Sequence, residues 1–538
     1  MIDFMPARMT TKSGIDCAHT VETAGILSPH ALEFVAKLER TFGKRRLSLL
    51  EARKVKQMAI DNGNLPDFLT ETAEVRASNW KVASVPVHIQ KRWTEIAGPT
   101  HRDRVISFLN SGADVYMADF EDGNSPTWHN MVEGQRNLRS AIRNEIDHTC
   151  TEGKEHKLNS DHAVLFVRPR GMHLEEEHVQ VHGKSISASL FDFGIYFFHN
   201  AQRLINNGFG PYFYLPKLEN HLEARWWNDV FNMAQDELKI ERGTIKATVL
   251  IETITAAYEM DEILYELRQH SAGLHAGRLD YIFSIIKTFR NQPGFWLPDR
   301  NQIKMTAPFM QAYTDFMIQT CHRRGTHALG GLSTFIPNPQ DPKATEAGMS
   351  KVRDDKWAEV KAGHDGTWIT HPDMVPMITR IFEDVLVHQP NQIDRQQDCV
   401  TVSAEDLRNF TIEGGTITNK GLCKNVNVSI LYINSWLNGT GTVPLYGMME
   451  DASTAEISRA QLWNWIRHSG AILADGRHVT LSLCRIIIRQ ELEAIHDQLG
   501  DADFNSGQYV LAAKLLDDMI SDDAFVDFLP LVGNDHLC

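Results

Sequence analysis

The sequence predicts an α/β protein built on a TIM (β/α)8 barrel, with an N-terminal helical clasp and a C-terminal helical plug. Three observations predict it: the length of the chain, eight strand–helix alternations in its centre, and charged residues at the ends of apolar runs. At 538 residues, the chain exceeds the roughly 250–300 residues at which a single core stops growing. We therefore expect three parts, covering residues 1–92, 93–385 and 386–538.

The composition is typical of a globular protein and argues against nucleic-acid or membrane binding. The net charge of −15 disfavours attraction to a phosphate backbone or to anionic lipid. No apolar run approaches the roughly 20 residues that span a bilayer. Seven cysteines are scattered without a CxxC pair, which fits a reducing compartment. Because the amino terminus shows no secretory signal, the expected location is the cytoplasm.

The first segment, residues 28–85, is expected to be helical. Ser28 is a good N-cap, and Pro29 suits the first helical position. Apolar residues then recur at helical spacing, and a second helix is expected around 44–62, ending at an Asp-Asn-Gly stop signal.

From residue 93 onward, short apolar runs alternate with helical segments. The expected strands are 93–97, 114–120, 163–169, 211–217, 246–252, 279–285, 327–336 and 366–372. Eight such units match an eightfold barrel, and the competing doubly wound sheet lacks its GxGxxG fingerprint here. After about residue 385 the strands end, and helices are expected at 420–437, 454–467, 484–498 and 508–520.

Four apolar runs deliver a charged residue at or just past their carboxyl ends: MADFED (117–122), LFVRPRG (165–171), VLIET (249–253) and GRLDYIF (277–283). In a parallel barrel all carboxyl ends open on one face, so Asp119, Glu121, Glu252, Asp280 and Arg168 should converge. Clustered carboxylates repel unless a cation lies between them, and Mg²⁺ is the simplest candidate. Salt bridges with loop lysines and arginines are the alternative for each of these residues.

Three side chains suggest further chemistry. Arg168 is permanently charged and suits an oxyanion. Ser453 and Glu456 form an S-x-x-E capping box, so a helix is expected to begin near Ser453. Asp451, just before that start, is either a general base or an ordinary capping residue. Glycines around Trp368 in GHDGTW indicate close approach by a ligand, although buried tryptophans are often core.

These segments resemble the malate synthase family, in its shorter A form, over nearly the whole chain. The motifs that carry the resemblance are DNGNLPDFLTET (61–72), MADFEDGNSPTW (117–128), FVRPRGMHLEE (166–176), SLFDFGIYFFHN (189–200), GPYFYLPK (210–217), GTIKATVLIET (243–253), GRLDYIFSIIKT (277–288), GHDGTWITHP (363–372) and PLYGMMEDASTAEISRAQLWNW (444–465). The resemblance implies condensation of acetyl-CoA with glyoxylate and hydrolysis of malyl-CoA to malate and CoA, in the glyoxylate cycle.

The resemblance also implies roles for individual residues. It makes Arg168 and Asp451 catalytic, and it makes Glu252 and Asp280 the ligands of Mg²⁺. It places two further acids, Asp119 and Glu121, in the outer shell of the metal. It assigns substrate binding to these residues: Trp368, Asp280, Leu279 and Pro372.

Two other functions stay open at this point. One is a citrate-lyase-like Mg²⁺ barrel without thioester hydrolysis, which has no need of the Asp451 segment. The other is a barrel retained as a binding or scaffold protein, which would have lost an acid or the arginine. The expected partners are acetyl-CoA and glyoxylate, and the expected state is a monomer. For the CoA phosphates the sequence offers only Lys91-Arg92.

Overall fold

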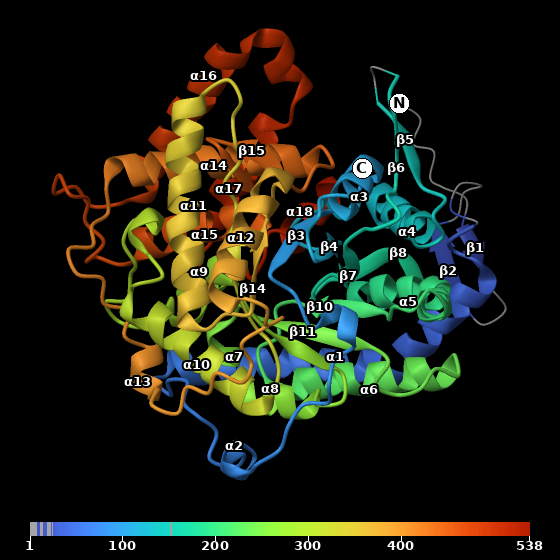
Figure 1. Cartoon of the computed structure of the whole chain (residues 1–538). Coiled ribbons are helices and arrows are strands. Elements are labelled where there is room, and N and C mark those ends of the chain that lie inside the picture. Colours follow the sequence, from blue (N-terminus) through green and yellow to red (C-terminus); the bar gives the residue numbers. More distant parts are fainter. Residues whose placement is uncertain (1–7, 11–13, 19–22, 24, 151–152, 538) are drawn as a thin grey trace.

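The structure, a computed structural model, describes residues 8–10, 14–18, 23, 25–150 and 153–537 (Figure 1). The start of the chain, where no secretory signal is indicated, lies largely outside this part. Within the described ranges, eight parallel strands close into a barrel, which confirms the predicted fold. In order around the barrel they are β3 (Thr94–Pro99), β4 (Val115–Asp119), β7 (Val164–Arg168), β10 (Tyr212–Leu215), β11 (Lys246–Ile251), β12 (Ser271–Ala276), β13 (Ala328–Ser333) and β14 (Gly366–Ile369).

Helices connect successive strands and surround the barrel (Figure 1). They are α3 (Arg102–Leu109), α4 (Trp128–Ile142), α5 (Ala188–Asn206), α6 (His221–Glu237), α7 (Ile254–Ala257), α8 (Met260–Glu266), α9 (Arg278–Phe289), α10 (Pro308–Arg324), α11 (Pro342–Ala362) and α12 (Val375–Leu386). Short additional elements are β5 (Asp147–Thr149), β6 (Glu155–Lys157), η1 (Val87–Ile89), η2 (Arg300–Gln302) and η3 (Pro372–Met374).

The sixth predicted strand, 279–285, is wrong: these residues form the first turns of α9, and the strand is β12. The apolar run of α9 is buried on nearly all sides, so its sequence lacks the periodicity that separates a buried helix from a strand. The run SAGLHA of β12 contains small and polar residues, which weaken its strand signal. As a result, Asp280 extends from the first turn of a helix.

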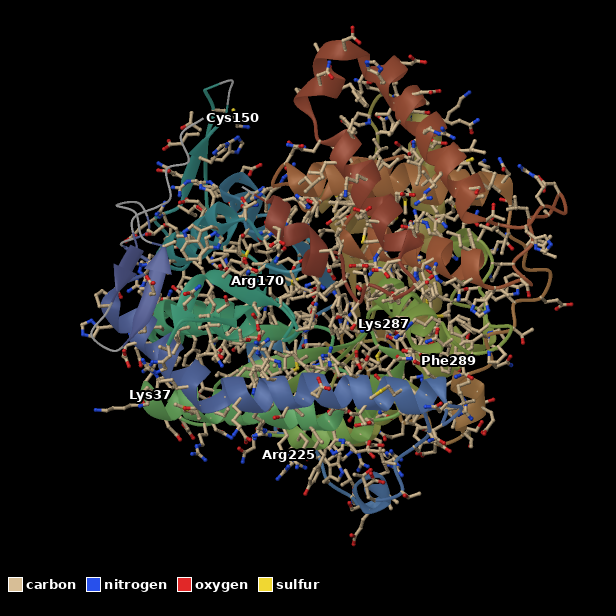
Figure 2. The ribbon with its side chains drawn as sticks, turned by 180° about the vertical axis from the view of Figure 1, so that it is seen from behind. Lys37, Cys150, Arg170, Arg225, Lys287 and Phe289 are labelled. Atoms are coloured by element: carbon tan, nitrogen blue, oxygen red, sulfur yellow. The ribbon has the colours of Figure 1, made fainter. Side chains whose placement is uncertain are left out.

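The clasp begins with one long helix, α1 (Pro29–Asp61), where two helices were predicted. Ser28 caps it as expected, because its hydroxyl accepts a hydrogen bond from the backbone N–H of Ala31 at 3.3 Å. Figure 2 shows α1 lying across the barrel helices, where it packs against α5 and α6. Arg53 of α1 donates to Glu223 of α6 at 2.7 Å, with both side chains largely buried.

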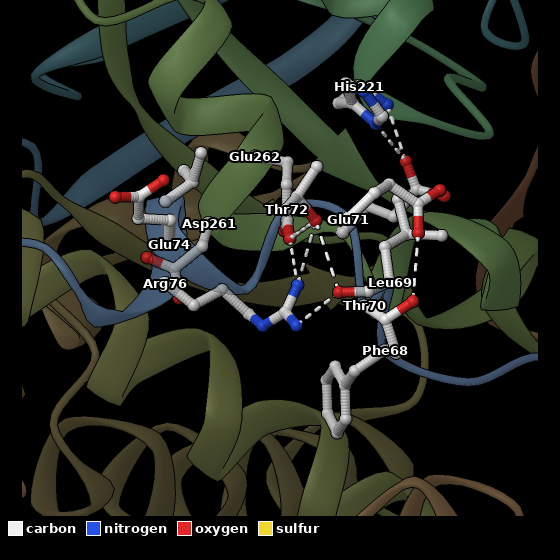
Figure 3. Close-up of polar contacts among 12 residues, drawn as sticks. Phe68, Leu69, Thr70, Glu71, Thr72, Glu74, Arg76, His221, Asp261 and Glu262 are labelled. Carbon is white, nitrogen blue, oxygen red and sulfur yellow. Dashed lines mark hydrogen bonds and ion pairs between the residues drawn. The ribbon is translucent and has the colours of Figure 1, made fainter.

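The chain after α1 is held against α8 by polar contacts (Figure 3). Thr72 donates its hydroxyl hydrogen to Glu262 at 2.6 Å, and Arg76 donates to the same carboxylate and to the carbonyl of Leu69. The short helix α2 (Ala73–Ala77) begins directly after Thr72 and contains Arg76. Strands β1 (Arg8–Thr10) and β2 (Ile15–Ala18) join β8 (Glu175–Val181) and β9 (Lys184–Ser187) in a small antiparallel sheet.

The C-terminal part is mostly helical, as predicted, but it also contains a short hairpin. Its elements are α13 (Ala404–Leu407), α14 (Asn419–Leu437), β15 (Val443–Leu445), β16 (Met448–Glu450), α15 (Ala452–Arg467), α16 (Leu481–Ser506), α17 (Tyr509–Ser521), α18 (Pro530–Gly533) and η4 (Asn534–His536). Helix α15 packs against α9 and α14, and the indole N–H of Trp465 donates to the carbonyl of Leu297 at 2.8 Å. No helix in the described ranges is both long and apolar enough to cross a membrane.

A buried ion pair joins four strands inside the barrel. Arg92, just before β3, is 0% exposed and donates to Glu95 at 2.6 Å. Its other N–H groups donate to the carbonyl of Ala272 at 2.7 Å, to Tyr214 at 2.7 Å and to Thr248 at 3.0 Å. This burial rules out Arg92 as a ligand of the CoA phosphates.

We predict that Arg92→Met destabilises the barrel by about 3–5 kcal/mol, because it leaves Glu95 as a buried charge without its partner. The measurement is urea unfolding followed by tryptophan fluorescence. The double variant with Glu95→Gln should recover part of the loss, since the uncompensated charge is then absent. Equal midpoints for the parent and the single variant would contradict a structural role for the pair.

Candidate active site

A cavity of about 160 Å³ opens at the carboxyl ends of the barrel strands and is covered by the C-terminal part. Its lining includes every predicted site residue except Glu121. These residues are Asp119, Arg168, Glu252, Leu279, Asp280, Trp368, Pro372 and Asp451. Positions separated by more than 300 residues in the sequence are therefore brought to one site.

Arg168 and Asp119 form the first pair of this site. They end β7 and β4 and lie opposite each other in the sheet register. The guanidinium donates from Nε to Asp119 Oδ1 at 2.7 Å and from Nη2 to Asp119 Oδ2 at 2.5 Å. Burial alone would lower the pKa of Arg168, but Asp119, together with Glu121 and Asp122, outweighs this effect and holds the pKa well above its usual value. Arg168 is thus ion-paired, yet it keeps N–H groups for the cavity it lines.

Lys217, which the sequence reasoning missed, supplies the positive charge among the remaining acids. Its Nζ lies 2.8 Å from Glu121, 2.6 Å from Asp122 and 3.5 Å from Asp280. Its backbone N–H donates to Glu252 Oε1 at 2.6 Å. Burial would lower the pKa of Lys217, but these carboxylates raise it well above its usual value. The run YFYLPK ends on the charged residue Lys217, and a charged residue at the end of an apolar run is the same signal that predicts the acids of the site.

The described residues of this cluster carry more negative than positive charge. The carboxylates are Asp119, Glu121, Asp122, Glu252 and Asp280, and the cations are Arg168 and Lys217. Burial raises the pKa of Glu121, Glu252 and Asp280. At Asp122 the opposite holds, because Lys217 and Arg168 outweigh burial and lower its pKa to about 2. The cluster therefore favours uptake of a proton or a further cation.

Glu252 and Asp280 suit a hard divalent cation. Both carboxylates line the cavity, and Asp280 Oδ1 is buried without a hydrogen-bond donor among the described residues. Lys217 Nζ forms an ion pair with this oxygen at 3.5 Å. Across the described ranges, no group of three or more His, Cys, Asp or Glu is arranged to hold a metal. Mg²⁺ commonly binds through one or two carboxylates and completes its shell with water and substrate, so this pair fits it.

Asp451 enters the cavity from the C-terminal part, at the start of α15. It is the N-cap of that helix, so the predicted Ser453–Glu456 capping box is wrong. Asp451 Oδ1 accepts hydrogen bonds from the backbone N–H of Ser453 at 3.1 Å and from the Ser453 hydroxyl. Glu456 instead accepts from Arg459 at 2.6 Å. Burial, aided by the charge of Asp122, raises the pKa of Asp451 to about 6.

The loop that carries the acids also supports the C-terminal part. The backbone N–H of Ala452 donates to the carbonyl of Asp122 at 3.2 Å, and Ser125 donates to the carbonyl of Trp436 at 2.7 Å. Gly441 lies so close that an added Cβ would come within 2.1–2.5 Å of the Asn124 backbone. Only glycine permits this approach, so the position of Asp451 is tied to the barrel loop.

The remaining predicted residues form the wall of the cavity. The indole ring of Trp368 lies near Arg168, and the guanidinium carbon is 5.7 Å from the centre of that ring. The indole N–H donates to Glu95 Oε2 at 2.9 Å, which links this wall to the buried pair inside the barrel. Leu279, in the first turn of α9, and Pro372 line the cavity as well.

Comparisons with known proteins agree over nearly the whole chain. Family models described as malate synthase N-terminal domain, TIM barrel domain and C-terminal match residues 19–74, 164–410 and 416–537. Malate synthase of Myxococcus xanthus is 53% identical over 96% of this chain and 94% of that protein. Malate synthase A of Escherichia coli is 45% identical over 94% of this chain and 95% of that protein.

A solved citrate lyase beta subunit from M. tuberculosis is 15% identical and covers 55% of this chain and 99% of that chain, with a TM-score of 0.35. At that score the likeness has no bearing on function. The two curated relatives, in contrast, match almost from end to end, including the segment that carries Asp451. The chain belongs to the malate synthase family.

Proposed function

We propose that the cavity beneath Asp451 is the site where this chain carries out the activity of its family, the joining of acetyl-CoA to glyoxylate and the hydrolysis of malyl-CoA. The observation that carries the proposal is that Asp451, from the C-terminal part, lines the same cavity as Arg168, Glu252 and Asp280 from the barrel. A barrel alone offers no base at this position. The malate produced belongs to the glyoxylate cycle.

Asp451 is the proposed base. The methyl group of a thioester is a very weak acid, so its proton moves to a carboxylate only if the resulting enolate is stabilised. Asp451 takes the proton, and the C–H electron pair becomes an enolate whose oxygen faces the guanidinium of Arg168. The raised pKa of Asp451, about 6, makes it a stronger base than an ordinary aspartate while leaving it ionised at neutral pH. The enolate carbon then bonds to the aldehyde carbon of glyoxylate, while the C=O π electron pair moves to the aldehyde oxygen, which takes a proton and becomes a hydroxyl. Water then attacks the thioester carbonyl of malyl-CoA, and the C–S bond breaks to give the new carboxylate of malate and the thiol of CoA.

Glu252 and Asp280 are the proposed ligands of Mg²⁺, which when bound would polarise the aldehyde as a Lewis acid. Asp280 and Leu279 lie in the first turn of α9, where the helix dipole favours an anion such as the carboxylate of glyoxylate. Trp368 and Pro372 line the same cavity. Asp119 and Glu121 then act indirectly: Asp119 orients Arg168, and Glu121 pairs with Lys217.

Several broader features are part of the same proposal. The proposed assembly state is a monomer. Cys150, Cys321, Cys399, Cys423 and Cys484 form no disulfide, which supports the proposed location in the cytoplasm. The proposed division into residues 1–92, 93–385 and 386–538 is supported by the barrel elements, which begin at Thr94 and end at Leu386.

We predict that Asp451→Asn abolishes malate formation, with a loss of about 10²–10⁴-fold or more, because an amide cannot accept the methyl proton. Deuterium exchange into the acetyl methyl group should vanish with it. In the parent, kcat/KM should fall below about pH 6, where Asp451 becomes protonated. The control is Asp475→Asn, an exposed acid of the same part, and equal activity in both variants would remove Asp451 from the mechanism.

We predict that Glu252→Gln and Asp280→Asn each raise the Mg²⁺ concentration needed for half-maximal activity by about tenfold or more, since a neutral amide is a weaker ligand for a hard cation. Glyoxylate affinity should weaken in parallel. Glu241→Gln, an exposed acid before the same strand as Glu252, is the matched control. An unchanged Mg²⁺ titration in both site variants would mean that the carboxylates are structural.

We predict that Arg168→Lys loses about 10²-fold or more in activity, because lysine keeps the charge but not the planar fork of donors. Calorimetric binding of Mg²⁺ and glyoxylate should stay near normal, while proton exchange at acetyl-CoA collapses. Arg225→Lys, an exposed arginine labelled in Figure 2, should leave both unchanged. Loss of metal binding in Arg168→Lys would instead assign Arg168 to organising the carboxylates.

A further inference from the structure

His275 is a buried polar residue of the cavity to which no role has been given so far. It belongs to β12, is 1% exposed and lines the same cavity as Trp368 and Glu252. In the sheet register it pairs with Leu250, two residues before Glu252. Because strands rise about 3.3 Å per residue, His275 lies one layer, roughly 6–7 Å, below the proposed metal ligand.

The ring of His275 is fixed by aromatic neighbours. Its centre is 3.9 Å from that of Trp368 and 5.9 Å from that of Tyr214, which it meets nearly edge to face. Both neighbours are held in turn, because Tyr214 and the indole N–H of Trp368 donate to Glu95. The imidazole therefore cannot turn away from the cavity without disturbing the barrel interior.

Neither ring nitrogen of His275 has a hydrogen-bond partner among the described residues. Two other buried histidines have partners at both ring nitrogens: His270 bonds with Gln235 and Asn228, and His322 with Asp365 and the carbonyl of Arg395. A buried polar group without a partner carries a desolvation penalty, so it calls for a partner from outside the protein. The open space that His275 lines is the cavity itself.

The imidazole is uncharged in this setting. Burial lowers the pKa of His275 well below its usual value, and nearby Arg92 and Lys356 act in the same direction. A neutral imidazole offers one N–H donor and one nitrogen acceptor. The lower end of the cavity thus has a polar group beside the apolar side chains of Leu250 and Leu332.

We propose that His275 is a specificity-determining residue that hydrogen-bonds to the small 2-oxo acid through one water held beside C2, and that it thereby favours glyoxylate over 2-oxo acids with an alkyl group at C2. The inference rests on the proposed function, because it takes the Trp368 side of the cavity as the glyoxylate end. Glyoxylate has only hydrogen at C2, which leaves room for this water, whereas an alkyl group would displace it and leave the donor and acceptor of the imidazole unpaired.

The test compares His275→Leu with His275→Asn in the full-length enzyme with Mg²⁺ and acetyl-CoA. Both variants lose the ring contact with Trp368, but only asparagine keeps a donor and an acceptor. Steady-state kinetics with glyoxylate and with pyruvate give the ratio of the two kcat/KM values. We expect this ratio to fall about tenfold or more in His275→Leu, mainly through the KM for glyoxylate, and to stay near the parent value in His275→Asn.

Equal shifts in the two variants, or an unchanged ratio in His275→Leu, would overturn the proposal and leave His275 a packing residue. If the leucine variant does not fold, His275→Met takes its place as the apolar partner of the comparison. His496→Leu, an exposed histidine of α16, is the control and should change neither constant.

Asp451→Asn, assayed beside these variants, separates this inference from the proposed function. If Asp451→Asn is inactive and the ratio in His275→Leu is unchanged, only the role of His275 fails. If Asp451→Asn keeps the parent rate, the cavity is not the active site and the proposed function fails first.

Discussion

The burial of several carboxylates at the mouth of the barrel is the constraint on which the rest of the structure depends. Parallel strands deliver Asp119 and Glu252 to one face, and the first turn of α9 adds Asp280. Buried charges persist only when paired, so Arg168 and Lys217 lie among them as counter-charges. Two cations do not balance all the acids. The remaining negative charge supports the proposed binding of a divalent cation, and burial together with the charge of Asp122 raises the pKa of Asp451.

The C-terminal part depends on the same loop that carries the acids. The carbonyl of Asp122 receives the first N–H of α15, and the backbone of Asn124 lies against Gly441. The position of Asp451 is therefore set by the barrel, although the two segments are far apart in the sequence. The charge of Asp122 also contributes to the raised pKa of Asp451. The loop that carries Asp122 and Asn124 thus links the charge of the acid cluster to the pKa of Asp451.

The sequence was sufficient for the barrel and for most of the site because charged residues after apolar runs leave a readable signal. The prediction fails where burial removes periodicity: the sequence predicts a strand at 279–285, but these residues belong to α9, so Asp280 lies on a helix. It also missed contacts that only the closed barrel creates. Lys217 follows an apolar run like the acids, but its role depends on three carboxylates from other elements. His275 gave no signal, because an unpartnered ring nitrogen is a property of the folded site.

The most direct test of this account is the position of the metal. Crystals soaked with Mn²⁺ in place of Mg²⁺ would show the ion by anomalous scattering. The account predicts one strong peak in the cavity within about 2.0–2.3 Å of carboxylate oxygens of both Glu252 and Asp280, with Lys217 still paired to Glu121 and Asp122. A peak bound by neither Glu252 nor Asp280, or an ion that takes the place of the Lys217 ammonium, would contradict it.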